Sequence, residues 1–329
     1  MTGPAAPSRS LDVVIPCFDE EELLPLTVPR IRAHLDALIA DPGNALDSWR
    51  LILVDDGSDD ATWSLIAGFA ADPAIVGVKL SRNFGHQLAM LAGLTHAAEP
   101  GGGDVVLTMD ADLQDDLAAI DAMVRAHEGG ADLALGVRSD RSSDSAGKSG
   151  SARLYYRLLR WMGVRVIEDH ADYRLMSRRA LEALLAHREV NLFLRGLIPQ
   201  LGFQVALIPY ARQARVAGTT KYSLRKMLRL AVDGITSFTV TPLRLIAVSG
   251  IAICALSFLT ALIFLILYVV ESDAMVPGWA SIALPILFLG GMQLLAIGVL
   301  GEYVGKIYLE VKARPRFLVE RVEGEDPPI

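Results

Sequence analysis

Two carboxylates spaced two residues apart carry the clearest chemical signal in this chain. Asp110 and Asp112 follow the apolar run 105–109, and Gln114 comes two residues later. Where a buried strand gives way to a loop, side chains at i and i+2 point the same way, so the two carboxylates can share one hard cation. A divalent cation held by one or two carboxylates usually keeps room for substrate phosphates. The alternative is a helix cap, but capping rarely needs two carboxylates and an amide.

A second acidic pair, Asp55 and Asp56, follows the apolar run 51–54. These carboxylates could accept hydrogen bonds from the base or ribose of a nucleotide. A strand-to-helix turn, in which Asp and Ser cap the next helix, would use the same residue types. Taken alone, the pair leaves both interpretations open.

Basic residues gather in two loops further along the chain. Arg138 and Lys148 lie at a Ser/Asp/Gly-rich stretch that is either a solvated loop or a lid closing a cationic wall over phosphates. Arg215 and Lys221 lie in a Gly-containing loop before the apolar C-terminal part, where an anionic lipid headgroup would meet the protein. A juxtamembrane patch attracted to acidic lipid is the competing interpretation.

Two further residues have an open interpretation. Asp172 lies between basic residues, so it could be a general base or one partner of a structural ion pair. His86 is interpreted as a polar residue at the start of a helix rather than as a catalyst or a ligand.

The elements that must position these residues alternate between strands and helices. Strands are expected at residues 11–16, 51–54, 75–80, 105–109 and 132–137. This alternation predicts an α/β fold with a mostly parallel sheet covered by helices on both faces. Ligands of such sheets bind beyond the carboxyl ends of the strands, where the acidic residues fall. Because no G-x-G-x-x-G turn or P-loop follows any strand, phosphates must be met by a metal and by side chains.

Two apolar segments, 245–270 and 279–301, carry no charge and exceed the roughly 20 residues that span a bilayer. Lys and Arg flank their outer ends and are missing from the connecting loop, so the positive-inside rule places both termini in the cytoplasm. Apolar residues at helical spacing predict an interfacial amphipathic helix just before them. The expected organisation is a disordered leader at 1–10, a cytoplasmic domain at 11–221, the amphipathic helix at 222–244, a transmembrane hairpin at 245–304 and a cytoplasmic tail at 305–329.

Composition excludes one class of partner and indicates a compartment. The net charge is -7 over 329 residues, and the first half holds no basic patch interleaved with aromatic residues, which argues against nucleic-acid binding. The two cysteines, Cys17 and Cys254, lie in a strand-like and a membrane-like run and are poor candidates for a disulfide. This fits a reducing compartment.

Eight motifs in order resemble one enzyme family. They are VVIPCFDEEE, ILVDDGSDDAT, LSRNFGHQLAMLAGL, MDADLQD, GVRSDR, DYRLMSR, NLFLRGL and RVAGTTKYS. The series, over about residues 11–316, resembles the family 2 glycosyltransferases that act on polyprenyl phosphates, among them bacterial polyprenyl-phosphate glucosyltransferases and dolichol-phosphate mannose synthases. The resemblance implies a GT-A (Rossmann-like) fold and inverting transfer of a sugar from a nucleotide diphosphate to a lipid phosphate.

The resemblance also implies roles for individual residues. The implied donor-binding residues are Pro16, Phe18, Glu20, Asp55 and Asp56. The implied ligands of Mg²⁺ or Mn²⁺ and the diphosphate are Asp110, Asp112 and Gln114. The implied acceptor-phosphate and lid residues are Arg138, Lys148 and Arg215, with Lys221 nearby, and Asp172 resembles the proposed catalytic base.

The chain departs from the family pattern at two places. Asp115-Asp116-Leu117 stands where the family often has Asn-Pro-Pro or Asp-Pro-Pro, so the following helix is expected to start differently. Phe18 and Asp19 stand where Tyr and Asn are common, which removes a hydroxyl that could touch the donor.

The expected substrates follow from this resemblance. A UDP-hexose, most simply UDP-glucose, is the expected donor, GDP-mannose is the alternative, and polyprenyl phosphate in the bilayer is the acceptor. An acceptor phosphate is largely dianionic at neutral pH, so Asp172 is expected to position groups as much as to take a proton.

A processive polysaccharide synthase is disfavoured, since two spans cannot form a translocation channel and no Q-x-x-R-W motif occurs. An inactive membrane sensor or scaffold is the alternative from another class, and the amphipathic helix and spans could also mediate a homo-oligomer.

Overall fold

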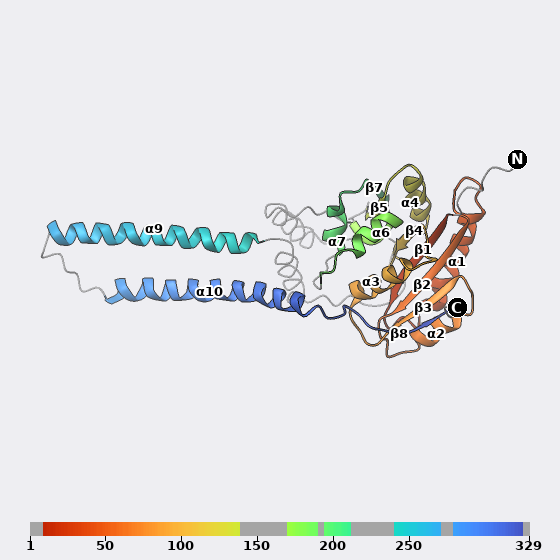
Figure 1. Cartoon of the computed structure of the whole chain (residues 1–329), viewed down its shortest axis with the longest axis horizontal. Helices are drawn as coiled ribbons and strands as arrows, with labels where there is room; N and C mark the ends of the chain where they lie inside the picture. Colours follow the sequence, from red (N-terminus) through yellow and green to blue (C-terminus); the bar gives the residue numbers. More distant parts are fainter. Residues whose placement is uncertain (1–8, 139–169, 190–193, 212–239, 271–278, 325–329) are drawn as a thin grey trace. The chain divides into compact units, whose positions relative to one another are not determined.

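Eight strands form one sheet in the order β7-β5-β6-β4-β1-β2-β3-β8 (Figure 1). The computed structural model describes residues 9–138, 170–189, 194–211, 240–270 and 279–324. The strands are β1 (Ser10–Cys17), β2 (Ser48–Asp55), β3 (Ile75–Leu80), β4 (Val105–Thr108), β5 (Leu133–Arg138), β6 (His170–Ser177), β7 (Val205–Tyr210) and β8 (Val319–Glu323). Only β6 and β8 run against the other described strands.

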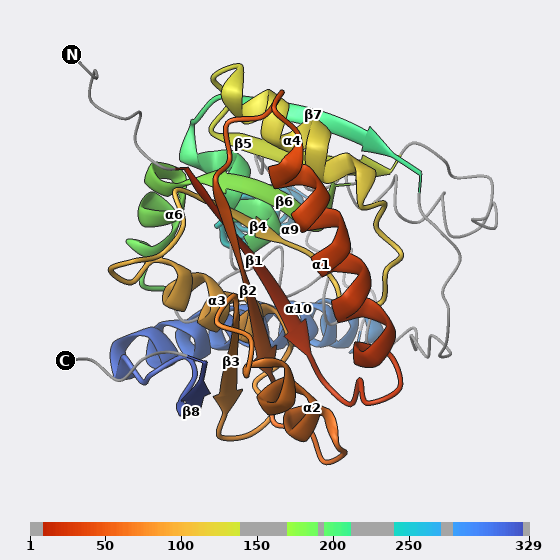
Figure 2. The same ribbon diagram turned by 90° about the vertical axis from the view of Figure 1, so that its right-hand side faces the viewer.

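The first five strands confirm the sequence prediction, because apolar, often β-branched runs bury both faces of a parallel sheet. Val13, Val14 and Ile15 in β1 have no exposed surface. Helices α1 (Leu24–Ala40), α2 (Thr62–Phe69) and α4 (Ala118–Glu128) contribute to one apolar core. Helices α3 (His86–Ala97), α6 (Arg178–Leu185) and α7 (Leu194–Leu197) contribute to a second core on the other face, beside the short helix η1 (Ile198–Leu201) (Figure 2). The predicted α/β class is therefore confirmed.

Helix α1 begins at Leu24, after the acidic run 19–22. This run is not helical, and Asp19 within it has a φ of 52°. The backbone N–H of Glu20 donates to Thr62 Oγ1 (2.8 Å), and that of Glu21 donates to Asp60 Oδ2 (3.2 Å). Hydrogen bonds to the β2–α2 loop thus hold the run outside the helix.

Helix α3 approaches the sheet closely at Gly93. A Cβ at this position would lie 2.3 Å from Cγ1 of Val14 and 2.8 Å from Cγ2 of Val54. Such distances are well below van der Waals contact, so the packing of α3 on β1 and β2 requires glycine here.

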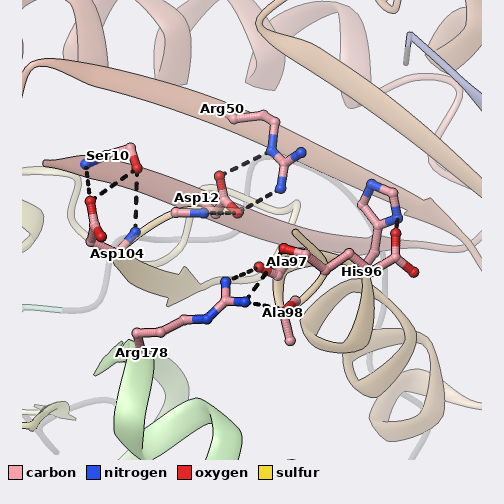
Figure 3. A network of polar contacts seen from close by, with 10 residues as sticks. Ser10, Asp12, Arg50, His96, Ala97, Ala98, Asp104 and Arg178 are labelled. Carbon is pink, nitrogen blue, oxygen red and sulfur yellow. Dashed lines mark hydrogen bonds and ion pairs between the residues drawn. The ribbon is translucent and has the colours of Figure 1, made fainter. Parts of the chain in front are cut away.

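A polar network ties the amino ends of the central strands together (Figure 3). Buried Asp12 in β1 accepts hydrogen bonds from Arg50 Nε (3.1 Å), Arg50 Nη2 (2.8 Å) and Gly103 N (2.9 Å). Arg178 donates to the carbonyls of Ala97 and Ala98 at the end of α3. These contacts satisfy backbone groups that a helix end leaves unpaired, and they fix the edge of the sheet opposite the acidic loops.

The chain after the second long helix returns to the sheet. The predicted tail at 305–329 contains β8, which pairs antiparallel with β3, and Ser81 N donates to the carbonyl of Leu318 (3.0 Å). Phe317 packs against the second core, which lies on the same face of the sheet as α3 and is called the α3-side core. Residues from 315 onward therefore group with the sheet unit, which comprises the strands and the six helices above with η1.

Helices α9 (Thr241–Val270) and α10 (Trp279–Lys312) form a second unit, the helix pair. Both are long and apolar enough to cross a membrane, with stretches of mean hydropathy 2.0 at Thr241–Thr260 and 1.4 at Phe288–Lys312. Helix α9 extends the predicted span 245–270 at its amino end, and α10 extends the predicted span 279–301 at its carboxyl end. Of the predicted amphipathic helix, residues 222–239 lie outside the described residues, as do residues 1–8 of the predicted leader.

Candidate active site

The carboxyl ends of β1, β2 and β4 meet at one edge of the sheet. Cys17 lies opposite Asp55 in the register, Val14 lies opposite Thr108, and Asp56 N donates to the carbonyl of Cys17 (2.9 Å). Because parallel strands end at the same edge, the loops that follow them converge. Most of the predicted site residues lie in these loops or at the strand ends that lead into them.

Asp55, the last residue of β2, has no exposed surface. Its Oδ1 accepts hydrogen bonds from Ser58 N (3.1 Å) and Ser58 Oγ (2.6 Å). Its Oδ2 is buried with no hydrogen-bond partner within the described part of the chain. Burial raises the pKa of Asp55, and the bonds from Ser58 partly oppose this. Such an oxygen is costly to bury unless a ligand donates a hydrogen bond to it.

Asp56 organises the loop between β3 and α3. Its Oδ1 accepts from Phe84 N (2.7 Å) and its Oδ2 from Gly85 N (2.9 Å). Burial raises the pKa of Asp56, and these two N–H groups oppose the increase. Gly57 has a φ of 69°, and a Cβ there would lie 2.4 Å from the carbonyl carbon of Arg82. The two loops are thus held against each other, and the ribose contact of Asp56 stays a prediction.

The loop after β1 presents the first predicted motif. Pro16 is buried within β1, whereas Phe18, beyond the end of the strand, is 42% exposed. The Glu20 backbone is tied to Thr62 Oγ1. A large exposed aromatic ring at this edge is available to contact a ligand.

The acidic loop after β4 is anchored from α1. Thr27 Oγ1 donates to the carbonyl of Ala111 (2.8 Å), and Gln114 N donates to Asp112 Oδ1 (3.2 Å). Asp110 and Asp112 are partly exposed, whereas Gln114 is buried. The two carboxylates thus reach solvent from a fixed backbone.

The donor set of this loop fits a hard cation that takes further ligands from outside the protein. Within the described residues, no three His, Cys, Asp or Glu side chains are grouped to hold a metal alone. Asp110, Asp112 and Gln114 offer carboxylate and amide oxygens, which Mg²⁺ and Mn²⁺ accept beside water and phosphate. Burial, with added repulsion from Asp110 and Asp112, raises the pKa of neighbouring Asp115 to about 6. A bound cation would offset this concentration of negative charge.

Asp172 lies on β6, beside β4, and its buried side is fixed by an ion pair. Arg174 Nη2 donates to Asp172 Oδ1 (2.5 Å), and Arg174 has no exposed surface. Arg174 Nε also donates to Thr108 Oγ1 (3.3 Å), which donates to the carbonyl of Asp172 (2.6 Å). The structural ion pair considered for Asp172 is therefore formed, and the carboxylate is held in one orientation.

His86, the first residue of α3, lies between the acidic loop and Asp172. Its Nε2 is 3.4 Å from Asp110 Oδ1 and 3.6 Å from Asp172 Oδ2. The predicted position at a helix start is confirmed. These two contacts could not be predicted from the sequence, because they depend on how α3 packs beside β4 and β6.

Arg138 ends β5 beside Tyr210, which ends β7. Tyr210 OH donates to Asp115 Oδ1 (2.6 Å), and Tyr173 OH donates to the carbonyl of Asp116 (3.0 Å). The two rings meet edge to face at 5.4 Å. Two tyrosines thus hold the segment where the family pattern often has Pro-Pro. Sequence reasoning missed both, since a tyrosine in a strand is usually a core residue.

Three predicted basic residues, Lys148, Arg215 and Lys221, lie outside the described residues, so their roles stay predictions. Arg138 is described, and its Nε is buried with no hydrogen-bond partner among the residues that the structure describes.

Carboxylates collected at the carboxyl edge of an α/β sheet mark that edge as the candidate ligand site. Residues 12–185, more than half of the chain, match the family model described as Glycosyl transferase family 2. The chain therefore belongs to glycosyl transferase family 2, and it is a glycosyltransferase.

Relatives match this chain over nearly its whole length. The uncharacterized glycosyltransferase YkoT of Bacillus subtilis (strain 168) is 44% identical over 313 residues, covering 94% of this chain and 91% of that one. The SfII prophage-derived bactoprenol glucosyl transferase of Shigella flexneri is 38% identical over 319 residues, covering 96% and 99%. The prophage bactoprenol glucosyl transferase homolog of Escherichia coli (strain K12) is 36% identical over 317 residues, covering 95% and 99%.

Proposed function

We propose that this glycosyltransferase moves a sugar from a UDP-hexose, most simply UDP-glucose, to polyprenyl phosphate, with inversion at the anomeric carbon. One observation carries the proposal: the likeness to the Shigella flexneri bactoprenol glucosyl transferase covers 96% of this chain. It therefore includes most of the sheet unit and the helix pair. A shared membrane-type segment fits a shared lipid acceptor better than a soluble one.

In this proposal, the donor nucleotide binds over the ends of β1 and β2. Asp55 Oδ2 is a buried acceptor to which an N–H of a nucleobase could donate. Asp56 holds the neighbouring loop, and Phe18 presents an exposed ring at the same edge. The preference for UDP over GDP rests on the glucosyltransferase relatives.

We propose that the diphosphate of the donor binds at the acidic loop, where Asp110, Asp112 and Gln114 would hold Mg²⁺ or Mn²⁺. When bound, the ion neutralises charge that develops on the departing nucleoside diphosphate. The protein contributes a preorganised loop, anchored through Thr27 to α1.

The acceptor phosphate needs little help to become a nucleophile, because it is largely dianionic at neutral pH. Asp172 is already paired with Arg174, so its role is mainly to hold groups in place. Arg138, Lys148, Arg215 and Lys221 supply the cationic contacts to phosphate. The helix pair crosses the cytoplasmic membrane with both termini inside, which raises the effective concentration of the lipid at the site.

The test incubates membranes containing the protein with undecaprenyl phosphate and labelled UDP-glucose, other UDP-hexoses or GDP-mannose. We expect label in the lipid fraction from a UDP-hexose, dependent on a divalent metal, and a loss of at least about 100-fold in Asp112→Asn. Asp104→Asn is the matched control, since Asp104 lies at the opposite edge of the sheet and its carboxylate accepts hydrogen bonds from the backbone N–H and the hydroxyl of Ser10. Transfer from GDP-mannose alone would favour a mannose synthase, and donor binding without any transfer would favour a sensor.

A further inference from the structure

Four side chains form a row of contacts across the candidate site, in the order Asp110, His86, Asp172, Arg174. The side chains of Asp110 and His86 are 38% and 46% exposed, whereas those of Asp172 and Arg174 are 7% and 0% exposed. His86 is therefore the point where the solvent-accessible part of the row meets its buried part.

The buried end of the row is fixed without His86. Arg174 holds Asp172 Oδ1, and Thr108 holds the backbone carbonyl of Asp172. The other carboxylate oxygen, Oδ2, faces His86 Nε2 at 3.6 Å. Among these contacts, only the one with His86 links Asp172 to the acidic loop.

The start of α3 holds His86 in place. Asp56 accepts hydrogen bonds from the backbone of Phe84 and Gly85, directly before the helix. Leu88 N then donates to the carbonyl of Gly85 (2.9 Å) to close the first turn. A side chain on a fixed helix end can set the distance between two neighbours more closely than one on a loop.

We propose that His86 is a positioning residue for sugar transfer, whose imidazole holds the carboxylates of Asp110 and Asp172 at a fixed separation. The inference rests on the proposed function and deepens it, because it ties the cation-binding loop to the acceptor side. Two facing carboxylates repel each other, and a polarised ring edge between them offsets that repulsion. Without the ring, the partly exposed Asp110 would turn away from the geometry that transfer needs.

The first test compares His86→Leu with His86→Gln, which keeps an N–H donor. We expect kcat to fall at least about tenfold in His86→Leu, with KM for the nucleotide sugar within about threefold, since misplaced groups cost rate more than binding. His86→Gln should recover part of the loss. His34→Leu is the matched control, because it removes a histidine 3.4 Å from Asp121, between α1 and α4. Loss in the control equal to that in His86→Leu would overturn the proposal.

The second test is a double-mutant cycle with Asp172→Asn. If His86 acts through Asp172, His86→Leu should cost less than about threefold in kcat once Asp172 has lost its charge. Losses that multiply would overturn the proposal. If the wild type transfers no sugar from any donor, the proposed function has failed. The same double-mutant cycle is then measured by the urea-unfolding midpoints of the full-length variants. Non-additive shifts in these midpoints support the contact between His86 and Asp172, and additive shifts overturn it.

Discussion

Asp55 keeps one carboxylate oxygen buried where a nucleobase could donate to it. Burial raises its pKa, so the folded chain binds this proton more tightly than the unfolded chain. The contribution of Asp55 to the free energy of unfolding therefore falls as pH rises above the usual carboxyl value of about 4. A polar group kept at the expense of stability is typical of a binding site.

Replacing Asp55 with Asn should separate stability from binding. We expect the unfolding midpoint of Asp55→Asn, relative to the wild type, to rise between pH 4.5 and pH 7.5, because Asn does not titrate. Affinity for UDP should fall at least about tenfold, as a buried acceptor is altered. Urea unfolding in detergent and calorimetric UDP titration measure the two effects, with exposed Asp41→Asn as the binding control. A relative midpoint that falls with pH would contradict this account of Asp55.

At the scale of elements, the packing of α3 decides where His86 lies. Gly93→Ala would place a Cβ 2.3 Å from Val14, so α3 must move or the core must shift. We expect a loss of about 1–3 kcal/mol in unfolding free energy and reduced transfer. Gly68→Ala in α2 is the matched control, since its Cβ would meet nothing within 4 Å and helix propensity favours Ala by about 1 kcal/mol. Thermal unfolding of both variants, alongside transfer assays, tests this; equal effects would contradict the close-packing argument.

The first five strands could be predicted from their apolar runs, whereas the three later strands were not predicted. Strands β1 to β5 are largely apolar, and acidic residues lie at or just after the ends of β1, β2 and β4, which revealed both the strands and the edge where the site lies. Strand β6 hides an arginine and an aspartate, and β8 reads as a polar edge segment, so both were missed. Strand β7, at the other edge of the sheet, was also missed, although its sequence VALIPY is apolar. The acidic side chains were visible as candidates, but their contacts with His86 and Tyr210 depend on distant elements meeting in space.

At the scale of the whole molecule, the helix pair is inserted in the chain between the two edge strands of the sheet. Strand β7 at one edge is the last described strand before α9, and β8 at the other edge is the first after α10. Strand β8 pairs with β3 along the edge of the sheet. The carboxyl end of β3 leads into the loop that is hydrogen-bonded to Asp56, and this loop leads to His86. The return of the chain to the sheet therefore supports the site as well as closing an exposed strand edge.

Deleting residues 315–329 should weaken the sheet unit and the reaction together. Removing β8 leaves the edge of β3 unpaired and takes Phe317 from the α3-side core. We expect Tm to fall by about 4–8 °C, equivalent to about 2 kcal/mol of unfolding free energy. We also expect kcat for transfer to fall by a larger factor than the factor by which KM for the donor rises. Deleting only residues 325–329 keeps β8 and is the matched control. If the longer deletion kept the wild-type Tm and activity, β8 would be a passive edge, and the site would depend on β1 to β6 and α3 alone.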